Sequence, residues 1–272
     1  MNAAPGAGGG WLAQARAAAD TPPQRPRAPL LLDIEGHPVR VGSVEPETAE
    51  LMRAAGLPLR PSMVAAGPMV GNGWQIAPPA DASLARIATW LHAAGLAGAW
   101  RDELLAVVDG DERDVARVER AAVRPLGLTT YAVHLVGRAF DGEGVWVQQR
   151  ALDKATDPGQ WDTLMGGQVA AGETADRALA RETWEEAGLD VATLIDLRRH
   201  DRITIRRPVA EGYMVEHIDV FSARLPPGCV PSNRDGEVER FECLDRAALA
   251  SRLAAGVFTL EASLILAASG TD

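Results

Sequence analysis

Residues 167–189 constrain this chain more than any other stretch, and they read GQVAAGETADRALARETWEEAGL. The segment 174–187 predicts a helix, and Gly188 predicts its end, because glycine readily adopts the left-handed conformation that closes many helices. Three glutamates of this helix are Glu182, Glu185 and Glu186. Their spacing of i, i+3 and i+4 places all three carboxylates on one face of the helix.

The crowding of these carboxylates has two interpretations. Glutamate-rich helix faces are commonly just solvated, so three glutamates by themselves do not identify a site. Like charges at this spacing also weaken an isolated helix, and a divalent cation would neutralise them. Ligands that are all oxygen favour a hard ion such as Mg²⁺, with Mn²⁺ as the alternative. The loop from Gly166 to Gly172 permits the close backbone approach that a metal or phosphate site needs.

The complete spacing of this stretch resembles the signature of the Nudix hydrolase family, G-x5-E-x7-R-E-U-x-E-E-x-G-U, in which U is a bulky aliphatic residue. The positions in register are Gly167, Glu173, Arg181, Glu182, Glu185, Glu186, Gly188 and Leu189. The one departure is Thr183 at the first U position, which is similar to valine in shape but carries a hydroxyl. The resemblance extends over about residues 128–268.

This resemblance implies a fold and an enzyme class. The fold is an α/β/α sandwich around a mixed sheet, and the activity is hydrolysis of a diphosphate bond. The resemblance assigns Glu182, Glu185 and Glu186 as catalytic residues and as ligands of one to three Mg²⁺ ions, which polarise the diphosphate and activate water. The structural positions of the signature, which orient those ligands, are Gly167, Glu173, Arg181 and Gly188.

The residues before the signature show a second, narrower resemblance. Residues 145–167 read VWVQQRALDKATDPGQWDTLMGG, with an arginine at a strand end, then a lysine, a Pro-Gly pair and a Gly-Gly pair. These residues are Arg150, Lys154, Pro158-Gly159 and Gly166-Gly167. The order is similar to that of the Nudix domain associated with thiamine pyrophosphokinase, a group that also carries an extra N-terminal domain. This resemblance implies thiamine diphosphate or its oxidised analogues as substrate, with the monophosphate and phosphate as products.

Further side chains are candidates for contact with the substrate. Arg150 and Lys154 are assigned to substrate binding, because cations complement a diphosphate; the alternative is that both are surface charges on a loop. Glu237 is assigned as a further catalytic acid or base, since Nudix enzymes often supply one from the loop before the last strand. Trp161 either stacks on a heteroaromatic ring or packs against the N-terminal domain, and packing is favoured.

The chain is expected to have three parts. Residues 1–29 predict a flexible N-terminus and linker, residues 30–125 a smaller α+β N-terminal domain, and residues 126–272 the Nudix domain. The N-terminal elements are a hairpin over 30–44 and helices over 11–19, 47–55, 81–94 and 111–123, with an irregular segment at 58–79 that contains short strands. The later elements are strands over 128–138, 145–150, 163–165, 201–209, 213–225 and 238–244, and helices capped by Asp245 and Thr259.

Composition limits the partners. The 272 residues carry a formal net charge of −10, which argues against a broad nucleic-acid-binding surface. The chain shows neither an apolar run long enough to span a membrane nor a signal peptide. Its two cysteines, Cys229 and Cys243, are too far apart in sequence for a Cys-x-x-Cys pair and favour a reduced, cytoplasmic protein. We expect a monomer or homodimer that binds a small-molecule diphosphate.

Three other functions remain open. The same chemistry applies to ADP-ribose or another nucleoside diphosphate derivative, because specificity lies outside the signature. An isopentenyl diphosphate isomerase is less favoured, since such enzymes generally lack the intact signature and need a cysteine near the start of this region. A non-catalytic metabolite-binding module is less favoured too, because no signature glutamate is lost.

Overall fold

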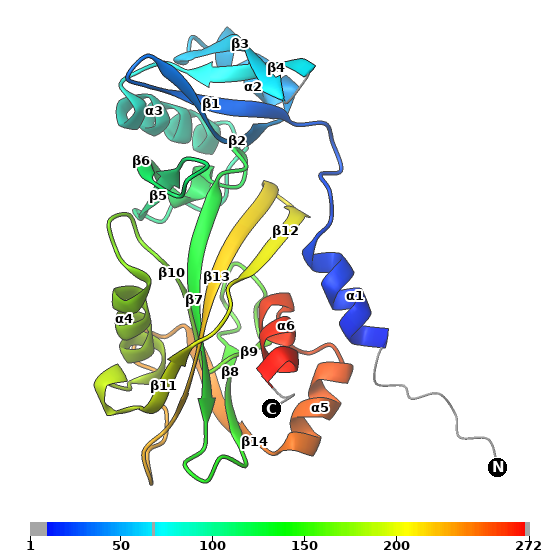
Figure 1. Ribbon diagram of the computed structural model, residues 1–272, viewed down its shortest axis with the longest axis vertical. Helices are drawn as coiled ribbons and strands as arrows, with labels where there is room; N and C mark the ends of the chain where they lie inside the picture. The colour runs from blue at the N-terminus through cyan, green and yellow to red at the C-terminus, as the bar shows by residue number, and fades with distance from the viewer. Residues whose placement is uncertain (1–9, 67–68, 270–272) are drawn as a thin grey trace, which may run out of the picture.

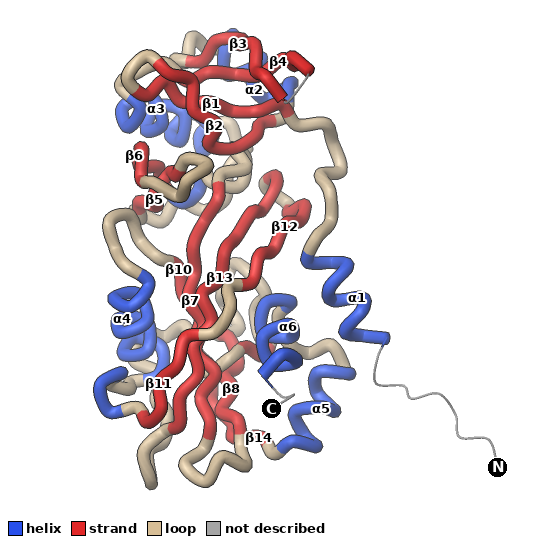
Figure 2. The backbone as a smooth tube through the Cα atoms, viewed as in Figure 1, coloured by secondary structure: helices blue, strands red, loops and turns tan. Residues whose placement is uncertain are grey.

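The structure is a computed structural model that describes residues 10–66 and 69–269. Over these residues the strands form a four-stranded, a two-stranded and an eight-stranded sheet (Figure 1). The largest sheet lies between helices (Figure 2). No helix in the described part is long and apolar enough to cross a membrane. Gly6 to Gly9, which the sequence predicts as part of a flexible start, lie outside the described residues.

The four-stranded sheet has the order β2-β1-β4-β3. Its elements are β1 (Ala28–Ile34), β2 (His37–Val44), β3 (Leu59–Ala66) and β4 (Met69–Ile76), with helices α2 (Pro46–Ala54) and α3 (Ala80–Ala93). Strands β1 and β2 confirm the expected hairpin, which turns at Glu35-Gly36 with positive φ at both residues. The segment 58–79 contains the expected strands but is more regular than expected, because β3 and β4 pair over eight residues each.

The small sheet corrects a second expectation. Residues 111–123 do not form a helix, because β6 (Asp114–Glu119) pairs antiparallel with β5 (Leu104–Val108), and only a short 3-10 turn η1 (Arg120–Ala122) follows. Asp109 accepts hydrogen bonds from the backbone N–H groups of Asp111 and Arg113, and so forms the tight turn between the strands. This local side-chain turn competes with a helix at the same residues.

The eight-stranded sheet has the order β11-β13-β7-β8-β14, with β10 beside β7, β12 beside β13 and β9 beside β8. Its strands are β7 (Thr129–Arg138), β8 (Val145–Arg150), β9 (Trp161–Asp162), β10 (Met165–Gln168), β11 (Ile195–Arg199), β12 (Ile203–Val209), β13 (Gly212–Arg224) and β14 (Val238–Leu244). Strands β7 and β13 are parallel, whereas the other pairs are antiparallel. The sheet is therefore mixed, as expected. The sequence did not predict β11.

Two apolar clusters cover the two faces of this sheet, because neighbouring residues of a strand point to opposite sides. On β7, Val133 and Leu135 face helix α4 (Ala175–Ala187) and pack with Leu179. Ala132 and Val136 face the other way, toward helices α5 (Arg246–Ala254) and α6 (Leu260–Ser269). The result is the expected α/β/α sandwich (Figure 2).

The N-terminal segment contacts both large sheets. Helix α1 (Gly10–Ala19) packs beside α6, and its Ala19 belongs to the apolar cluster on that face. The guanidinium of Arg27 donates to the backbone oxygens of Ser43 and Pro125, at 2.6 Å each. Helix α1 confirms the helix expected over 11–19, and Arg27 anchors the end of the segment expected to be a linker.

Candidate active site

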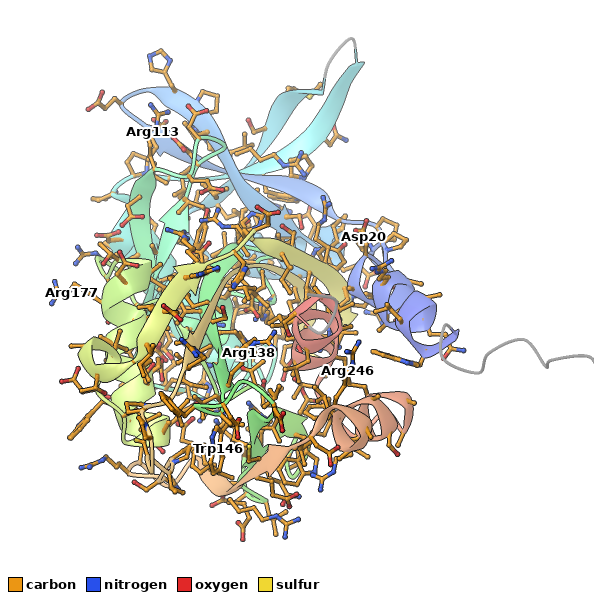
Figure 3. The ribbon with its side chains drawn as sticks, turned by 60° about the horizontal axis from the view of Figure 1, so that its bottom comes forward. Asp20, Arg113, Arg138, Trp146, Arg177 and Arg246 are labelled. Atoms are coloured by element: carbon orange, nitrogen blue, oxygen red, sulfur yellow. The ribbon has the colours of Figure 1, made fainter. Side chains whose placement is uncertain are left out.

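Local signals at both ends of α4 fix its position. The hydroxyl of Thr174 accepts a hydrogen bond from the Arg177 N–H, which caps the first turn. Arg177 points outward from the helix into solvent (Figure 3). Gly188 ends the helix with φ of 66°. The expected helix and its glycine stop are therefore confirmed.

The segment before β14 is bound to the carboxyl end of α4. The Ser232 N–H donates to the carbonyl oxygen of Ala187, and the Arg234 N–H donates to that of Glu185. A Cβ at Gly188 would lie only 2.7 Å from the Ser232 carbonyl oxygen. The close approach requires glycine there and places residues 232–237 beside the signature glutamates.

Glu186 is the most deeply buried signature carboxylate, with 1% of the residue exposed. Its Oε2 accepts hydrogen bonds from Gln148 Nε2 at 2.9 Å and from the Gly166 N–H at 3.1 Å. Its Oε1 lies 3.6 Å from Lys154 Nζ. Burial raises the pKa of Glu186 to about 8, although Lys154 and both hydrogen bonds act to lower it. The ionised form of Glu186 is therefore not fully compensated by one lysine and two hydrogen bonds.

Glu182 lies directly against the backbone of β10. A Cβ at Gly167 would fall 2.0 Å from the Glu182 Cδ, so only glycine leaves room for this carboxylate. Burial raises the pKa of Glu182, and the charge of Arg181 partly opposes that shift. Glu185 is more exposed, with 43% of its side chain accessible.

Arg181 joins the loop to the helix. Its guanidinium donates to both carboxylate oxygens of Glu173, at 3.0 and 2.9 Å, and also to the Gln168 carbonyl. Its Nη1 reaches Glu182 Oε1 at 2.7 Å and Glu185 Oε2 at 3.1 Å. The hydrogen bonds from Arg181 lower the pKa of Glu173. These contacts link Glu173, in the loop before α4, to Glu182 and Glu185 on the helix.

Lys154 and Glu237 form an ion pair beside Glu186. The Lys154 Nζ lies 2.5 Å from Glu237 Oε2, and the Ala151 N–H donates to the Glu237 carbonyl oxygen. Burial acts to raise the pKa of Glu237, but the hydrogen bond and charge of Lys154 lower it overall. Both residues that the sequence singled out are thus close to the signature helix.

Arg150 has a different environment from the one expected of a substrate-binding residue. Its Nε and Nη2 donate to the Thr156 carbonyl oxygen, and its Nη1 lies 3.4 Å from Asp162 Oδ2. Its donors thus hold the loop between β8 and β9.

Trp161 is buried with Leu249 and Phe258, under the guanidinium of Arg252. Its expected packing against the N-terminal domain is wrong, because the register of β9 turns the indole toward α5 and α6.

The donor chemistry of the site fits a hard divalent cation. The oxygen-only side chains are Glu182, Glu185 and Glu186, and the buried Glu186 needs positive charge. In the described residues, however, no three acidic, histidine or cysteine side chains converge on one point. The guanidinium of Arg181, which contacts Glu182 and Glu185, accounts for this arrangement.

Comparison with known proteins agrees with the fold and the signature. The family model described as "NUDIX domain" matches residues 129–261. An isopentenyl-diphosphate Delta-isomerase from Leifsonia xyli subsp. xyli is 33% identical over 183 residues, which are 62% of this chain and 94% of that protein. The chain therefore belongs to the Nudix family.

Other relatives cover the chain less completely. Nudix hydrolase 24, chloroplastic, from Arabidopsis thaliana is 31% identical over 49% of this chain. The match spans 37% of that protein, so this chain corresponds to little more than a third of its length. The crystal structure of DR0079 from Deinococcus radiodurans has a TM-score of 0.51 and 22% identity, and covers 62% of this chain and all of that one. This structural likeness supports the fold alone.

Sequence reasoning missed the groups that hold Glu186. Gln148 comes from β8 and the Gly166 N–H from β10, and both reach the helix only through the sheet. Gln148 has no motif around it, so no signal in the sequence identifies it. The sequence marks Gly166 only as part of a loop that permits close backbone approach, and does not show that its N–H reaches Glu186.

Proposed function

We propose that this protein is a Mg²⁺-dependent hydrolase that cleaves a diphosphate bond in a small organic diphosphate. The observation that carries the proposal is the environment of Glu186. Two N–H donors hold its Oε2, while its Oε1 faces Lys154. A buried ionised carboxylate is destabilising unless opposite charge lies close to it. Lys154 is shared between Glu186 and Glu237, so its single charge does not neutralise both carboxylates. A divalent cation beside Glu186 would supply the remaining positive charge.

The three signature glutamates, Glu182, Glu185 and Glu186, would hold the cation. When bound, it supplies positive charge to the diphosphate and makes water more acidic. Arg181, fixed by Glu173, orients the carboxylates of Glu182 and Glu185.

The ion pair of Lys154 and Glu237 has a separate part in the proposed reaction. Lys154 binds a phosphate oxygen as a point charge. Glu237, which Lys154 keeps ionised, accepts the proton of the attacking water. One phosphorus–oxygen bond of the anhydride breaks, and two phosphate-bearing fragments leave.

For the substrate we propose thiamine diphosphate or an oxidised analogue, with the monophosphate and phosphate as products. The support is the loop between β8 and β9, which carries the narrower sequence resemblance. Arg150 braces this loop through the Thr156 carbonyl, and the loop delivers Lys154 to Glu186. ADP-ribose and related nucleoside diphosphates are the alternative within the same chemistry.

Isomerisation of isopentenyl diphosphate is a second candidate, because the Leifsonia relative that carries this name matches over 94% of its length. The position of the cysteines disfavours it. Cys243 pairs with Trp146, four residues from the site end of β8, and Cys229 follows β13. No hydrogen bond joins either thiol to a signature glutamate among the described residues.

The test is a turnover assay with Mg²⁺ and a substrate panel. The panel holds thiamine diphosphate and its oxo and oxy analogues, ADP-ribose, NADH, deoxynucleoside triphosphates and isopentenyl diphosphate, with products resolved by mass. Thiamine monophosphate and phosphate are the expected products. Cleavage of nucleotides alone would discard the thiamine assignment, and isomerisation without phosphate release would replace the hydrolase proposal.

Glu186→Gln serves as the blank for every substrate, and Glu47→Gln, on the exposed face of α2, is the matched control. Activity that survives in Glu186→Gln would count as contamination or as evidence against the site.

A further inference from the structure

A cavity of about 830 Å³ opens where the three sheets meet, and pockets of this size hold small organic ligands. Its walls come from β2, from the turn between β5 and β6, from β7, β12 and β13, and from the linker between α1 and β1. This linker runs from the eight-stranded sheet to the four-stranded sheet (Figure 1). A ligand in the cavity would therefore contact all three sheets.

The cavity wall is positively charged, although the chain has a formal net charge of −10. One carboxylate, that of Asp109, lies in the wall, and it is already paired, because Arg113 Nη2 is 2.7 Å from Asp109 Oδ2. Four arginines line the same cavity, namely Arg25, Arg27, Arg40 and Arg206. The wall therefore has more positive charge than its own carboxylate neutralises.

Carboxylates outside the wall compensate this charge only in part. Glu45 Oε2 lies 3.3 Å from Arg25 Nη1, and Asp20 Oδ1 lies 3.4 Å from Arg206 Nε. Arg40 is exposed, and its side chain has neither an ion pair nor a hydrogen bond with any residue that the structure describes. The guanidinium of Arg40 is therefore available to a ligand.

Arg27 is the buried arginine of the wall, with 4% of its side chain exposed. Its Nε donates to Ser43 Oγ, and its Nη2 donates to the carbonyl oxygens of Ser43 and Pro125. Its Nη1 donates no hydrogen bond within the described chain, and the Glu45 carboxylate, which also pairs with Arg25, is 3.8 Å away. Burial lowers the pKa of Arg27, and the charge of Glu45 opposes this only in part. An anion beside Nη1 would stabilise this buried cation.

The sequence holds Arg27 in place without a ligand. Residues 21–29 contain four prolines, and each proline fixes its own φ, so the linker is stiff. The Thr21 N–H donates to the Arg206 carbonyl oxygen at 2.8 Å, which ties the linker to β12. A Cβ at Gly127 would lie 3.1 Å from Arg27 Nη2, so glycine leaves room for the guanidinium. Binding therefore requires little further ordering of this wall, and this favours affinity.

The cavity is separate from the catalytic carboxylates. Among the described residues, no signature residue lines it, and neither Lys154 nor Glu237 does. Thr129, which lies in the wall, is four residues from Val133, and Val133 is opposite Gly167 of β10. Four residues of a strand span about 13 Å. A molecule in the cavity would thus be distinct from a diphosphate held at the signature helix.

The chemistry of the wall indicates the class of ligand. Guanidinium groups bind phosphate oxygens through paired N–H donors, and several of them suit the double charge of a phosphate monoester better than the single charge of a carboxylate. Apolar side chains lie between the arginines, with Tyr213 beside them, and they include Pro23, Val41, Val108 and Val215. The combination fits a phosphate group on a less polar organic body.

We propose that this cavity is a second ligand site, which binds a small organic phosphate monoester. The phosphate accepts hydrogen bonds from Arg27 Nη1 and from the guanidiniums of Arg40 and Arg206. The organic part lies against Val41 and Val108. Because the ligand contacts the linker and all three sheets, its binding stabilises the packing of the N-terminal sheets on the Nudix domain. The site does not depend on the proposed hydrolysis.

The experiment is calorimetry on the full chain without divalent cations. The probes are adenosine monophosphate, thiamine monophosphate and glucose 6-phosphate, each compared with adenosine, thiamine or glucose. We expect at least one monoester to bind at one site per chain, about tenfold or more tightly than its phosphate-free counterpart. No binding of any monoester, or equal affinity with and without the phosphate, overturns the proposal.

Two variants locate the bound phosphate. Arg40→Gln and Arg206→Gln should each weaken monoester binding about tenfold, because each removes a charged donor. Both side chains are exposed, so folding should be unaffected. The matched control is Arg16→Gln, on the exposed face of α1 and outside the cavity, which should keep the wild-type dissociation constant. Wild-type affinity in both cavity variants contradicts the assignment.

A further variant separates the cavity from the catalytic site. Lys154→Gln should leave monoester binding unchanged, and the monoester should raise the melting temperature of Lys154→Gln but not that of Arg40→Gln. Binding that is lost in Lys154→Gln and kept in Arg40→Gln would place the ligand at the catalytic site and overturn the proposal. Monoester binding in a protein that hydrolyses no diphosphate would refute the proposed function and keep the second site.

Discussion

At the scale of single residues, the signature glutamates differ in burial although they share one helix face. Glu186 is buried against Gln148 and Gly166, whereas 43% of the Glu185 side chain is accessible. We predict that Glu186→Gln and Glu185→Gln each lower kcat about 10³-fold, the scale on which lost charge stabilisation reduces catalysis. Steady-state kinetics with Mg²⁺ check this, with circular dichroism to verify folding. Near-normal turnover in either variant would overturn the metal assignment.

Thr183, the one departure from the family signature, has a structural consequence. Its side chain is fully buried on α4, and its hydroxyl has no hydrogen-bond partner among the described residues. We predict that Thr183→Val stabilises the protein by about 1 kcal/mol, because it removes an unsatisfied polar group and keeps the shape. Thr183→Ser retains the hydroxyl and loses a methyl group, so it should destabilise. Urea unfolding distinguishes the two, and a less stable valine variant would contradict the account.

Glu261 predicts a pH dependence of stability. Burial raises the pKa of Glu261 to about 7, from an unfolded value near 4.5. The folded state binds the proton more tightly, so this group favours folding at low pH and loses that effect as the pH rises from about 4.5 to 7. Glu261→Gln removes the titration. Its free energy of unfolding, relative to wild type, should rise by up to about 3 kcal/mol between pH 5 and 8. A pH-independent difference would show that the carboxyl group is not perturbed.

The residues of the site were predictable only where local spacing encodes them. The signature predicts its glutamates and Arg181, and the residues before the signature predict Arg150 and Lys154. The groups that surround Glu186 are separated in sequence by up to 38 positions. Strand pairing brings them together, and no local pattern in one sequence reveals that pairing.

At the scale of elements, the end of α4 depends on one glycine. We predict that Gly188→Ala destabilises the protein more than Gly256→Ala, which is the matched control because its φ of 68° is nearly the same. An alanine at Gly256 meets no atom within 4 Å, whereas at Gly188 it meets the Ser232 carbonyl. The control should lose about 1 kcal/mol from backbone strain alone, and Gly188→Ala about 1–3 kcal/mol more.

The same pair of variants tests the link from α4 to Glu237. Displacement of Ser232 shifts the segment that carries Glu237, so kcat should fall in Gly188→Ala and stay normal in Gly256→Ala. Equal stabilities and equal kcat values would mean that the segment adapts without strain.

Elements with strong local signals were predicted well, and those that depend on tertiary pairing were not. Helix α4 has a cap, an amphipathic pattern and a glycine stop, and the β1–β2 hairpin has its Glu35-Gly36 turn. Residues 111–123 carry apolar residues at ambiguous spacing, and pairing with β5 made β6 a strand. Strand β11 was not predicted, because four of its five residues are exposed and three of those four are charged. Leu197 is the exposed apolar residue among them.

At the scale of the whole molecule, the four-stranded and eight-stranded sheets are joined by hydrogen bonds to buried backbone groups. The Ser43 N–H donates to the Leu126 carbonyl, and Leu126 and Leu128 belong to the apolar cluster of the N-terminal sheet. Arg124, at the expected domain boundary, pairs with the buried Glu216 of β13. A cut at residue 125 would therefore expose apolar side chains and leave a buried carboxylate unpaired. Point substitutions are a better test of this junction than truncation.

Arg27 and Arg25 provide that test with a matched pair. The Arg27 side chain is 4% exposed and donates to Ser43 and Pro125, whereas that of Arg25 is 73% exposed and pairs with Glu45 alone. We predict that Arg27→Met lowers the free energy of unfolding by about 2–4 kcal/mol, because buried carbonyl oxygens on both sides of the junction lose their donor. Arg25→Met should change the free energy of unfolding by less than about 0.5 kcal/mol, because exposed ion pairs contribute little to stability.

Urea unfolding measures the stability of both variants. The kcat of the folded Arg27→Met protein should stay at the wild-type value, since the signature helix is not part of this contact. If the two variants are equally stable, the junction does not contribute to folding and the N-terminal sheet is only loosely attached; a fall in kcat without loss of stability would instead mean that the junction positions the site.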